Sequence, residues 1–118
     1  MFKIIYMDDE ADICDAFAEI MESDTIQIFT FTSPNELLKN IDAIAPDLII
    51  SDYRMPGLNG VELARKLSPH LPKVLLTGEL SLKDTSDFIK VFHKPCDFRT
   101  LRAFLNDFEA GFNKEKAS

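Results

Sequence analysis

Short apolar runs alternate with segments of helical periodicity along the whole chain. The apolar, β-branched runs predict five strands, and apolar residues that recur every three or four positions predict helices between most of them. The strands are predicted at residues 3–7, 26–31, 47–51, 73–76 and 89–93. Strands that alternate with helices are joined by right-handed crossovers, so the pattern predicts an α/β fold with a parallel sheet and helices on both faces.

Helical periodicity covers four segments. The helices are predicted at residues 11–23, 34–40, 61–67 and 98–112. The second of these has a clear beginning, because Ser33 can act as N-cap, Pro34 suits the first turn and Glu36 stands at the third helical position. The run at 47–51 is unbroken by polar residues between Asp47 and Ser51, which is typical of a central strand covered on both faces.

The last predicted helix carries a stripe of large apolar side chains. They recur at steps of three and four residues: Phe98, Leu101, Leu105, Phe108 and Phe112. We interpret the stripe as core that covers the sheet, with a homodimer interface as the alternative. Residues 111–118 turn polar and are interpreted as a tail or linker of a single domain that spans residues 1–118.

Polar side chains stand where the predicted strands end. They are Asp8 and Asp9 after the first strand, Asp52 after the third, Thr77 after the fourth and Lys94 after the fifth. Each one alone would be an ordinary capping or exposed residue. Ligands of a parallel α/β sheet bind at the carboxyl ends of its strands, where these groups would converge. Their joint occurrence therefore predicts a functional site at this edge.

The chemistry of this site follows from its charge. Three carboxylates that lie close together repel one another unless a cation sits among them. A cluster without His or Cys favours Mg²⁺ over zinc, since Mg²⁺ prefers carboxylate and water oxygens. Beside Mg²⁺, Asp52 can attack phosphorus and form an aspartyl phosphate. Lys94 and the Thr77 hydroxyl would then bond to the phosphoryl group.

Composition and charge exclude several classes of protein. The 118 residues are 46% hydrophobic and 28% charged, as in ordinary globular domains. A formal net charge of -7 argues against direct binding to nucleic acid. Cys14 and Cys96 form no metal-binding or disulfide pattern, which suits the reducing cytoplasm. The chain has no basic leader and no apolar run near the ~18 residues that span a membrane.

Four motifs together resemble the response-regulator receiver domain, the module shared by chemotaxis regulators and two-component transcription factors. They are YMDDE at 6–10, IISDYRMPGLNG at 49–60, LLTG at 75–78 and FHKP at 92–95. The resemblance implies a flavodoxin-like, doubly wound sheet of strand order 2-1-3-4-5. It also implies that a sensor histidine kinase or a phosphotransfer protein donates the phosphoryl group to Asp52.

The resemblance further implies the role of each site residue. Asp9, Asp52 and the backbone carbonyl of Arg54 would bind Mg²⁺ directly, and Asp8 would act through water. Capture of phosphoryl by Asp52 would draw Thr77 inward and change a surface that binds a downstream protein target or a fused output domain. Such a domain is a regulatory phosphoacceptor in the cytoplasm and not an enzyme, although it assists its own phosphorylation and dephosphorylation.

The sequence departs from the family pattern in the fifth strand and before it. Val91 stands where the family usually has the Tyr or Phe of the switch, and Phe92, one position later, should face the other side of the sheet. Only 17 residues separate Thr77 from Lys94, so the fourth helix is predicted to be short or irregular, with at most a short helix at 81–87.

Arg54 and Glu79 occupy positions that vary in the family. We expect them to pair across the site entrance and slow hydrolysis of the phosphoryl group, or else to point separately into solvent. Two alternatives to a phosphorylatable receiver are a pseudo-receiver and a small phosphatase. A pseudo-receiver would bind its partner without phosphorylation, which Val91 and the short fourth helix favour. A phosphatase of haloacid-dehalogenase type would need Asp two residues after the nucleophile, where this chain has Arg54.

Overall fold

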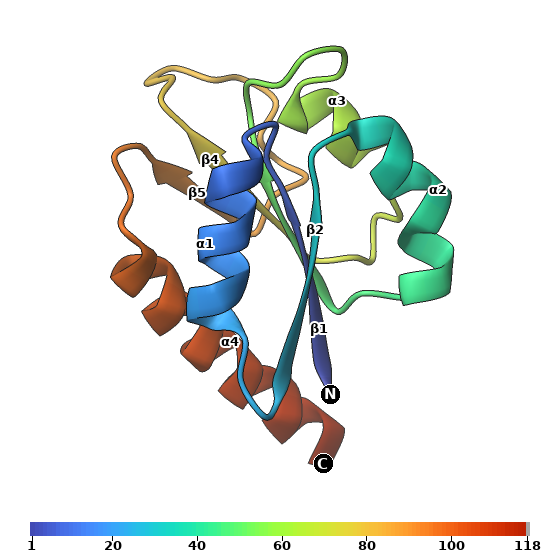
Figure 1. The fold of residues 1–118 in the computed structure, drawn as a ribbon, viewed down its shortest axis with the longest axis vertical. Helices are drawn as coiled ribbons and strands as arrows, with labels where there is room; N and C mark the ends of the chain where they lie inside the picture. The colour runs from blue at the N-terminus through green and yellow to red at the C-terminus, as the bar shows by residue number, and fades with distance from the viewer. Residues whose placement is uncertain (118) are drawn as a thin grey trace.

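Five parallel strands form one sheet in the order β2-β1-β3-β4-β5, as predicted (Figure 1). The structure is a computed structural model that describes residues 1–117, so residue 118 of the predicted tail lies outside the described residues. The strands are β1 (Phe2–Met7), β2 (Ile26–Phe31), β3 (Leu48–Asp52), β4 (Lys73–Thr77) and β5 (Lys90–His93). The helices are α1 (Ala11–Met21), α2 (Pro34–Ile44), α3 (Gly60–Arg65) and α4 (Phe98–Ala117).

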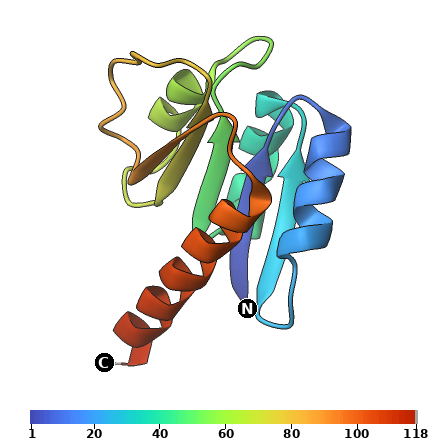
Figure 2. The same ribbon diagram turned by 90° about the vertical axis from the view of Figure 1, so that its left-hand side faces the viewer.

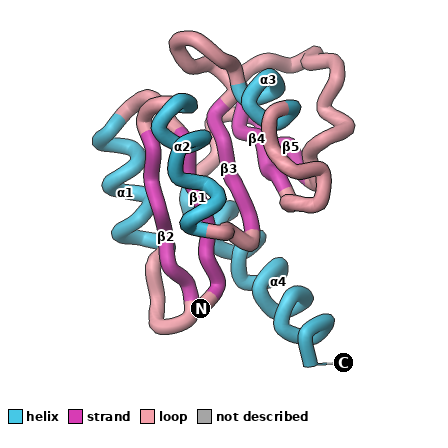
Figure 3. Tube along the Cα trace, turned by 90° about the vertical axis from the view of Figure 1, so that its right-hand side faces the viewer, coloured by secondary structure: helices cyan, strands magenta, loops and turns pink. Residues whose placement is uncertain are grey.

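Helices α1 and α4 cover one face of the sheet, and α2 and α3 cover the other (Figures 2 and 3). Successive side chains of β1 alternate between the two layers, as a strand requires. Ile4 and Tyr6 belong to the core under α1 and α4, whereas Ile5 and Met7 belong to the core under α2 and α3. The central strands are thus buried from both sides, which explains their unbroken apolar runs.

Helix α4 packs its aromatic stripe against the sheet. The ring of Phe2 on β1 lies 5.7 Å from that of Phe108 and 5.0 Å from that of Phe112. The interpretation of the stripe as core is therefore confirmed. Residues 111–117 continue α4, so the helix does not stop where the sequence turns polar. No helix among the described residues combines the length and the apolar character needed to cross a lipid bilayer.

Helix α2 begins as predicted and ends later than predicted. The Ser33 side chain accepts a hydrogen bond from the Glu36 backbone N–H, and Pro34 occupies the first turn. The helix runs on to Ile44, because Ile41 and Ile44 extend the stripe that packs on the second core. It stops at Ala45, which adopts a left-handed conformation with φ of 52°.

The connection between β4 and β5 contains no helix. Residues 78–89 form turns and bends, and Asp84 has a left-handed φ of 62°. The prediction of a short or irregular fourth helix is therefore confirmed, and no helix forms in this segment at all. Gly, Ser, Thr and Asp are frequent in this segment, and these residues favour turns over helices. Figure 1 shows the segment, in yellow and orange, looping away from the sheet beside α3.

Candidate functional site

Three carboxylates meet at the carboxyl ends of β1 and β3. Met7 is paired with Ser51, so the next residues along the two strands, Asp8 and Asp52, lie side by side. One carboxylate oxygen each from Asp8, Asp9 and Asp52 lies within 4.8 Å of the others. Asp8 and Asp52 are only 2% and 5% exposed, whereas Asp9 is open to solvent. The predicted convergence of the acids is thus present in the fold.

Lys94 reaches the same site from the end of β5. Its Nζ lies 2.6 Å from Oδ1 of Asp52, and its backbone N–H donates to the carbonyl of Thr77 at 2.8 Å. The Lys94 side chain is 45% exposed and the Asp52 side chain 8%, so the ion pair bridges solvent and core. The ammonium partly offsets the negative charge of the acids and fixes one of the two Asp52 oxygens.

Thr77 ends β4 beside Lys94, and its side chain is almost fully buried. Its hydroxyl oxygen accepts a hydrogen bond from the backbone N–H of Glu79 at 2.9 Å. The hydroxyl proton remains available, since a Thr hydroxyl can donate one bond while it accepts others. Thr77 is therefore placed at the site edge, with its oxygen already tied to the β4–β5 connection.

Asp8 is held by two donors from the chain. Its Oδ2 accepts from the Tyr6 hydroxyl at 3.1 Å and its Oδ1 from the Glu10 backbone N–H at 3.0 Å. Burial raises the pKa of Asp8 and raises that of Tyr6, whose hydroxyl therefore keeps its proton. The thiol of Cys14 lies 3.4 Å from the Asp8 carbonyl oxygen, and burial raises its pKa to about 11.

Tyr6 is a site residue that the pattern of polar strand ends does not predict. Its signal was nevertheless present, because residues two apart on a strand point to the same face, and Tyr6 precedes Asp8 by two. A phenol at the end of a buried run needs a hydrogen-bond partner, and the neighbouring carboxylate is the nearest one in the sequence.

The loop after Asp52 is shaped by Gly60 and Asn59. A Cβ atom at Gly60 would lie 2.6 Å from the Asp52 carbonyl oxygen and 2.7 Å from Cδ1 of Leu75, so only glycine fits there. Asn59 and Glu62 form a reciprocal capping box at the start of α3. The start of α3 is thereby held against the backbone of Asp52.

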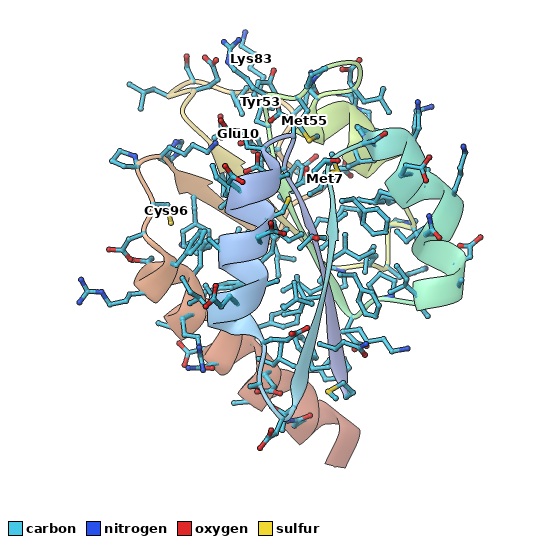
Figure 4. All side chains as sticks on the ribbon, viewed as in Figure 1. Met7, Glu10, Tyr53, Met55, Lys83 and Cys96 are labelled. Atoms are coloured by element: carbon cyan, nitrogen blue, oxygen red, sulfur yellow. The ribbon has the colours of Figure 1, made fainter. Side chains whose placement is uncertain are left out.

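Arg54 and Glu79 pair across the entrance, as predicted. Nε of Arg54 donates to Oε1 of Glu79 at 2.7 Å, and Nη2 contacts the same oxygen. The pair and Asp9 border a hollow of about 530 Å³. Figure 4 shows the labelled Glu10, Tyr53 and Met55 gathered at this end of the sheet, with Cys96 apart from them near the start of α4.

The fifth strand confirms the expected departure from the family pattern. Phe92 packs on the α1 and α4 side, where its ring meets that of Phe104 edge-on at 5.5 Å. Val91, the residue before it, points to the opposite face and is half-buried. Phe92 therefore does not replace the aromatic ring that is missing at position 91.

The donor set fits a small, hard divalent cation. All three candidate side chains offer carboxylate oxygens, with no nitrogen or sulfur ligand among them, which suits Mg²⁺. Arg54, whose carbonyl is the fourth predicted ligand, lies two residues after Asp52 in the loop that borders the same hollow.

Comparisons with known proteins identify similar sequences and structures. A model of the response regulator receiver domain matches residues 4–106. The C4-dicarboxylate transport transcriptional regulatory protein DctD of Rhizobium meliloti is 36% identical over 79 residues, which are 64% of this chain and 17% of DctD. The chain thus spans only a small part of this curated relative.

Solved structures agree with the fold over nearly the full length. A response regulator receiver domain protein from Clostridium thermocellum has 26% identity and a TM-score of 0.82, over 99% of this chain and 98% of that one. Response regulator TrrA of Thermotoga maritima, solved with Mg²⁺ and BeF, has 26% identity and a TM-score of 0.76, over 91% and 98%. TrrA in complex with histidine kinase ThkA gives 27% identity and a TM-score of 0.78, over 91% and 97%.

Proposed function

Because the chain belongs to the response regulator receiver domain family, we propose that it accepts a phosphoryl group on Asp52 with the help of Mg²⁺. One observation carries the proposal: three carboxylates lie within 4.8 Å of one another, and the Lys94 ammonium lies 2.6 Å from Asp52. A cluster of this charge needs a cation, and a phosphoryl group needs positive partners, so the same geometry suits both.

Each residue has a distinct part in the proposed reaction. Asp52 is the nucleophile, and before the reaction Lys94 holds one of its carboxylate oxygens, Oδ1. The new O–P bond forms as the P–N bond of a donor phosphohistidine breaks, and the imidazole leaves with the electron pair. Bound Mg²⁺ would screen charge between the carboxylate and the donor, held by Asp9, Asp52 and the carbonyl of Arg54, with Asp8 acting through water. Thr77 and Lys94 then bond to the phosphoryl oxygens.

The decisive experiment is phosphorylation by a small donor. Acetyl phosphate with Mg²⁺ should add one phosphoryl group to the wild-type chain, measured by mass spectrometry, and none to Asp52→Asn. Asp42→Asn, which removes an exposed carboxylate on α2, is the matched control and should be modified like the wild type. A mass gain in Asp52→Asn, or none in the wild type, would contradict the proposal.

Arg54 and Glu79 are proposed to lengthen the life of the phosphoryl group by narrowing access for water. Arg54→Ala should shorten that lifetime roughly twofold to fivefold, the rate equivalent of losing an exposed ion pair. Loss of label from the phosphorylated chain measures it. Arg65→Ala breaks the other ion pair to the β4–β5 connection, Arg65 to Asp84, and should leave the lifetime unchanged. An equal or longer lifetime in Arg54→Ala would refute this role.

The partners follow from the family. TrrA was solved with a histidine kinase, and DctD is a transcriptional regulator much longer than this chain. We propose a cytoplasmic regulator, not an enzyme, that receives phosphoryl from a histidine kinase or phosphotransfer protein and acts on a protein target or a fused output domain. Its net charge of -7 disfavours direct contact with nucleic acid.

A pseudo-receiver remains a second candidate, because Val91 and the missing helix alter the usual switch region. In that case beryllofluoride with Mg²⁺ would leave the amide NMR signals of residues 78–93 unchanged. A phosphorylatable receiver should shift these signals, and Asp52→Asn should abolish the shift.

A further inference from the structure

We infer that Tyr6 is a positioning residue of the metal site: its buried hydroxyl fixes Asp8 so that Asp8 serves the ion through water, which favours Mg²⁺ over larger cations such as Ca²⁺. The inference rests on the proposed Mg²⁺ site and deepens it. It assigns to a core residue of β1 a part in choosing the metal.

The packing of the Tyr6 ring does not explain why this position holds a tyrosine and not a phenylalanine. Tyr6 is 1% exposed and stacks on Phe17 of α1, with ring centroids 4.0 Å apart and planes 9° apart. A phenylalanine would make the same stack. A hydroxyl buried in a core weakens the fold unless it is hydrogen-bonded, and this one donates to Oδ2 of Asp8 at 3.1 Å.

Asp8 is restrained at both oxygens, unlike its neighbours in the cluster. Tyr6 binds Oδ2 and the Glu10 backbone N–H binds Oδ1, so the plane of the carboxylate is set by β1 and by the start of α1. Asp9 is exposed, and Asp52 is tied at Oδ1 by Lys94. A carboxylate held at both oxygens cannot turn to offer both of them to an ion, which keeps it in the outer shell.

Metals differ in how they tolerate this restraint. Mg²⁺ keeps several of its waters and binds one or two carboxylates directly in a strict octahedron. Ca²⁺ accepts six to eight oxygens and often takes a carboxylate with both of them. A fixed Asp8 that works through water therefore suits Mg²⁺, whereas a free Asp8 could swing inward and complete a larger shell. Groups in the outer shell of metal sites commonly alter affinity tenfold or more.

The test is the binding of Mg²⁺ and of Ca²⁺ to Tyr6→Phe, measured by titration calorimetry. We expect Mg²⁺ affinity to fall about tenfold. Ca²⁺ affinity should stay or rise, so that the Mg²⁺ to Ca²⁺ ratio falls at least as much. Thr25→Val removes a hydroxyl beside the start of β1, at the opposite end of the sheet, and should leave both affinities unchanged. Equal affinities in Tyr6→Phe and wild type, or an equal loss for both ions, would overturn the inference.

A double-mutant cycle asks whether Tyr6 acts through Asp8. In an Asp8→Ala background, Tyr6→Phe should change Mg²⁺ affinity less than twofold, because the group that Tyr6 positions is gone. Additive losses would place the effect of Tyr6 elsewhere and refute the inference. Circular dichroism checks that Tyr6→Phe keeps the fold, as its retained ring stack leads us to expect.

Different results would refute the proposed function and the role of Tyr6. A wild-type chain that binds no Mg²⁺ and takes no phosphoryl group would overturn the proposed function and the role of Tyr6 together. A wild type that does both, with metal selectivity unmoved by Tyr6→Phe, would overturn the role of Tyr6 alone.

Discussion

The strands that carry the acids and the strand that carries Lys94 are built differently. β3 is buried along its whole length and β1 at all but one position, whereas no residue of β5 is fully buried. Helices cover β1 and β3 on both sides, but no helix joins β4 to β5. The Asp52 carboxylate is therefore held by buried strands, whereas Lys94, which contacts it, follows the thinly covered β5.

This difference in burial makes the surroundings of Asp52 more constrained than the β4–β5 connection. The position of Asp52 depends on the buried packing of β3 between its neighbours β1 and β4. Few side-chain contacts hold the β4–β5 connection. They include the ion pairs of Arg54 with Glu79 and of Arg65 with Asp84, the bond from the Glu79 N–H to Thr77, and the packing of Phe88 beside α3. Exposed ion pairs contribute only about 0.2–1 kcal/mol each, so modest forces at the site can move this connection.

Alanine substitutions at Gly60 and Gly78 compare how tightly the two regions are packed. The largest loss of stability is expected at Gly60. Gly60→Ala places a Cβ 2.6 Å from the Asp52 carbonyl oxygen, so it should destabilise the chain by about 3 kcal/mol. Gly78→Ala lies in the β4–β5 connection, where nothing stands within 4 Å, and should stay within about 0.5 kcal/mol. Urea unfolding measures both. Similar losses would show that the two halves are equally constrained.

A smaller effect is expected at Phe88, the apolar anchor of the β4–β5 connection. Phe88 borders, with Leu63 and Leu67 of the second core, a void of only about 10 Å³. Since Phe88 is half-buried, Phe88→Ala should cost about 2 kcal/mol, below the range for buried phenylalanines. Hydrogen exchange of residues 78–89 should speed up.

Leu80 provides the control for Phe88 on the same segment. It is 88% exposed, and Leu80→Ala should change stability by less than about 0.5 kcal/mol. If the two substitutions gave the same loss, or if exchange in the connection stayed as in the wild type, the anchoring role of Phe88 would be wrong.

The smallest effect is expected at Asp97, on the border between β5 and α4. Its Oδ1 accepts bonds from the backbone N–H of Thr100 at 2.8 Å and from its hydroxyl at 3.1 Å, and these lower the pKa of Asp97. The folded carboxyl thus releases its proton more readily than the unfolded one. Its contribution to stability is complete above the ordinary Asp pKa of about 3.9 and is lost as pH falls through the lowered value.

Asp97→Asn tests this dependence, because asparagine caps a helix but does not titrate. The wild type should be slightly more stable than the variant at pH 6, and the difference should vanish on acidification to about pH 2.5, measured by thermal unfolding. Thr100→Val removes only the hydroxyl bond and should reduce part of the difference. A difference that is constant across this pH range would contradict the prediction.

Much of the site followed from where apolar runs end. The runs before Asp8 and Asp52 are long enough to define buried parallel strands, and parallel strands end at the same edge of a sheet, so the convergence of these acids at that edge was predictable. The strand order needed the resemblance to a family, because periodicity does not specify which strands are neighbours.

Other features depend on tertiary contacts that local pattern does not contain. The end of α2 at Ile44 is set by packing of Ile41 and Ile44 on the second core, and propensity alone predicted an earlier stop. The bond from Tyr6 to Asp8 depends on α1 closing over the ring of Tyr6. In both cases the residues are visible in the sequence, but the contact that explains their role is made with another element of the fold.

The lack of a helix between β4 and β5 also decides where this domain can accept foreign sequence. Leu80 and Ser81 are exposed at the tip of the connection, and exposed tips of this kind tolerate insertions and grafted domains. A fluorescent module spliced in after Leu80 would be tethered a few residues from Thr77 while the buried strands stay intact. If the proposed phosphorylation of Asp52 is confirmed, such an insertion would give a genetically encoded sensor of it.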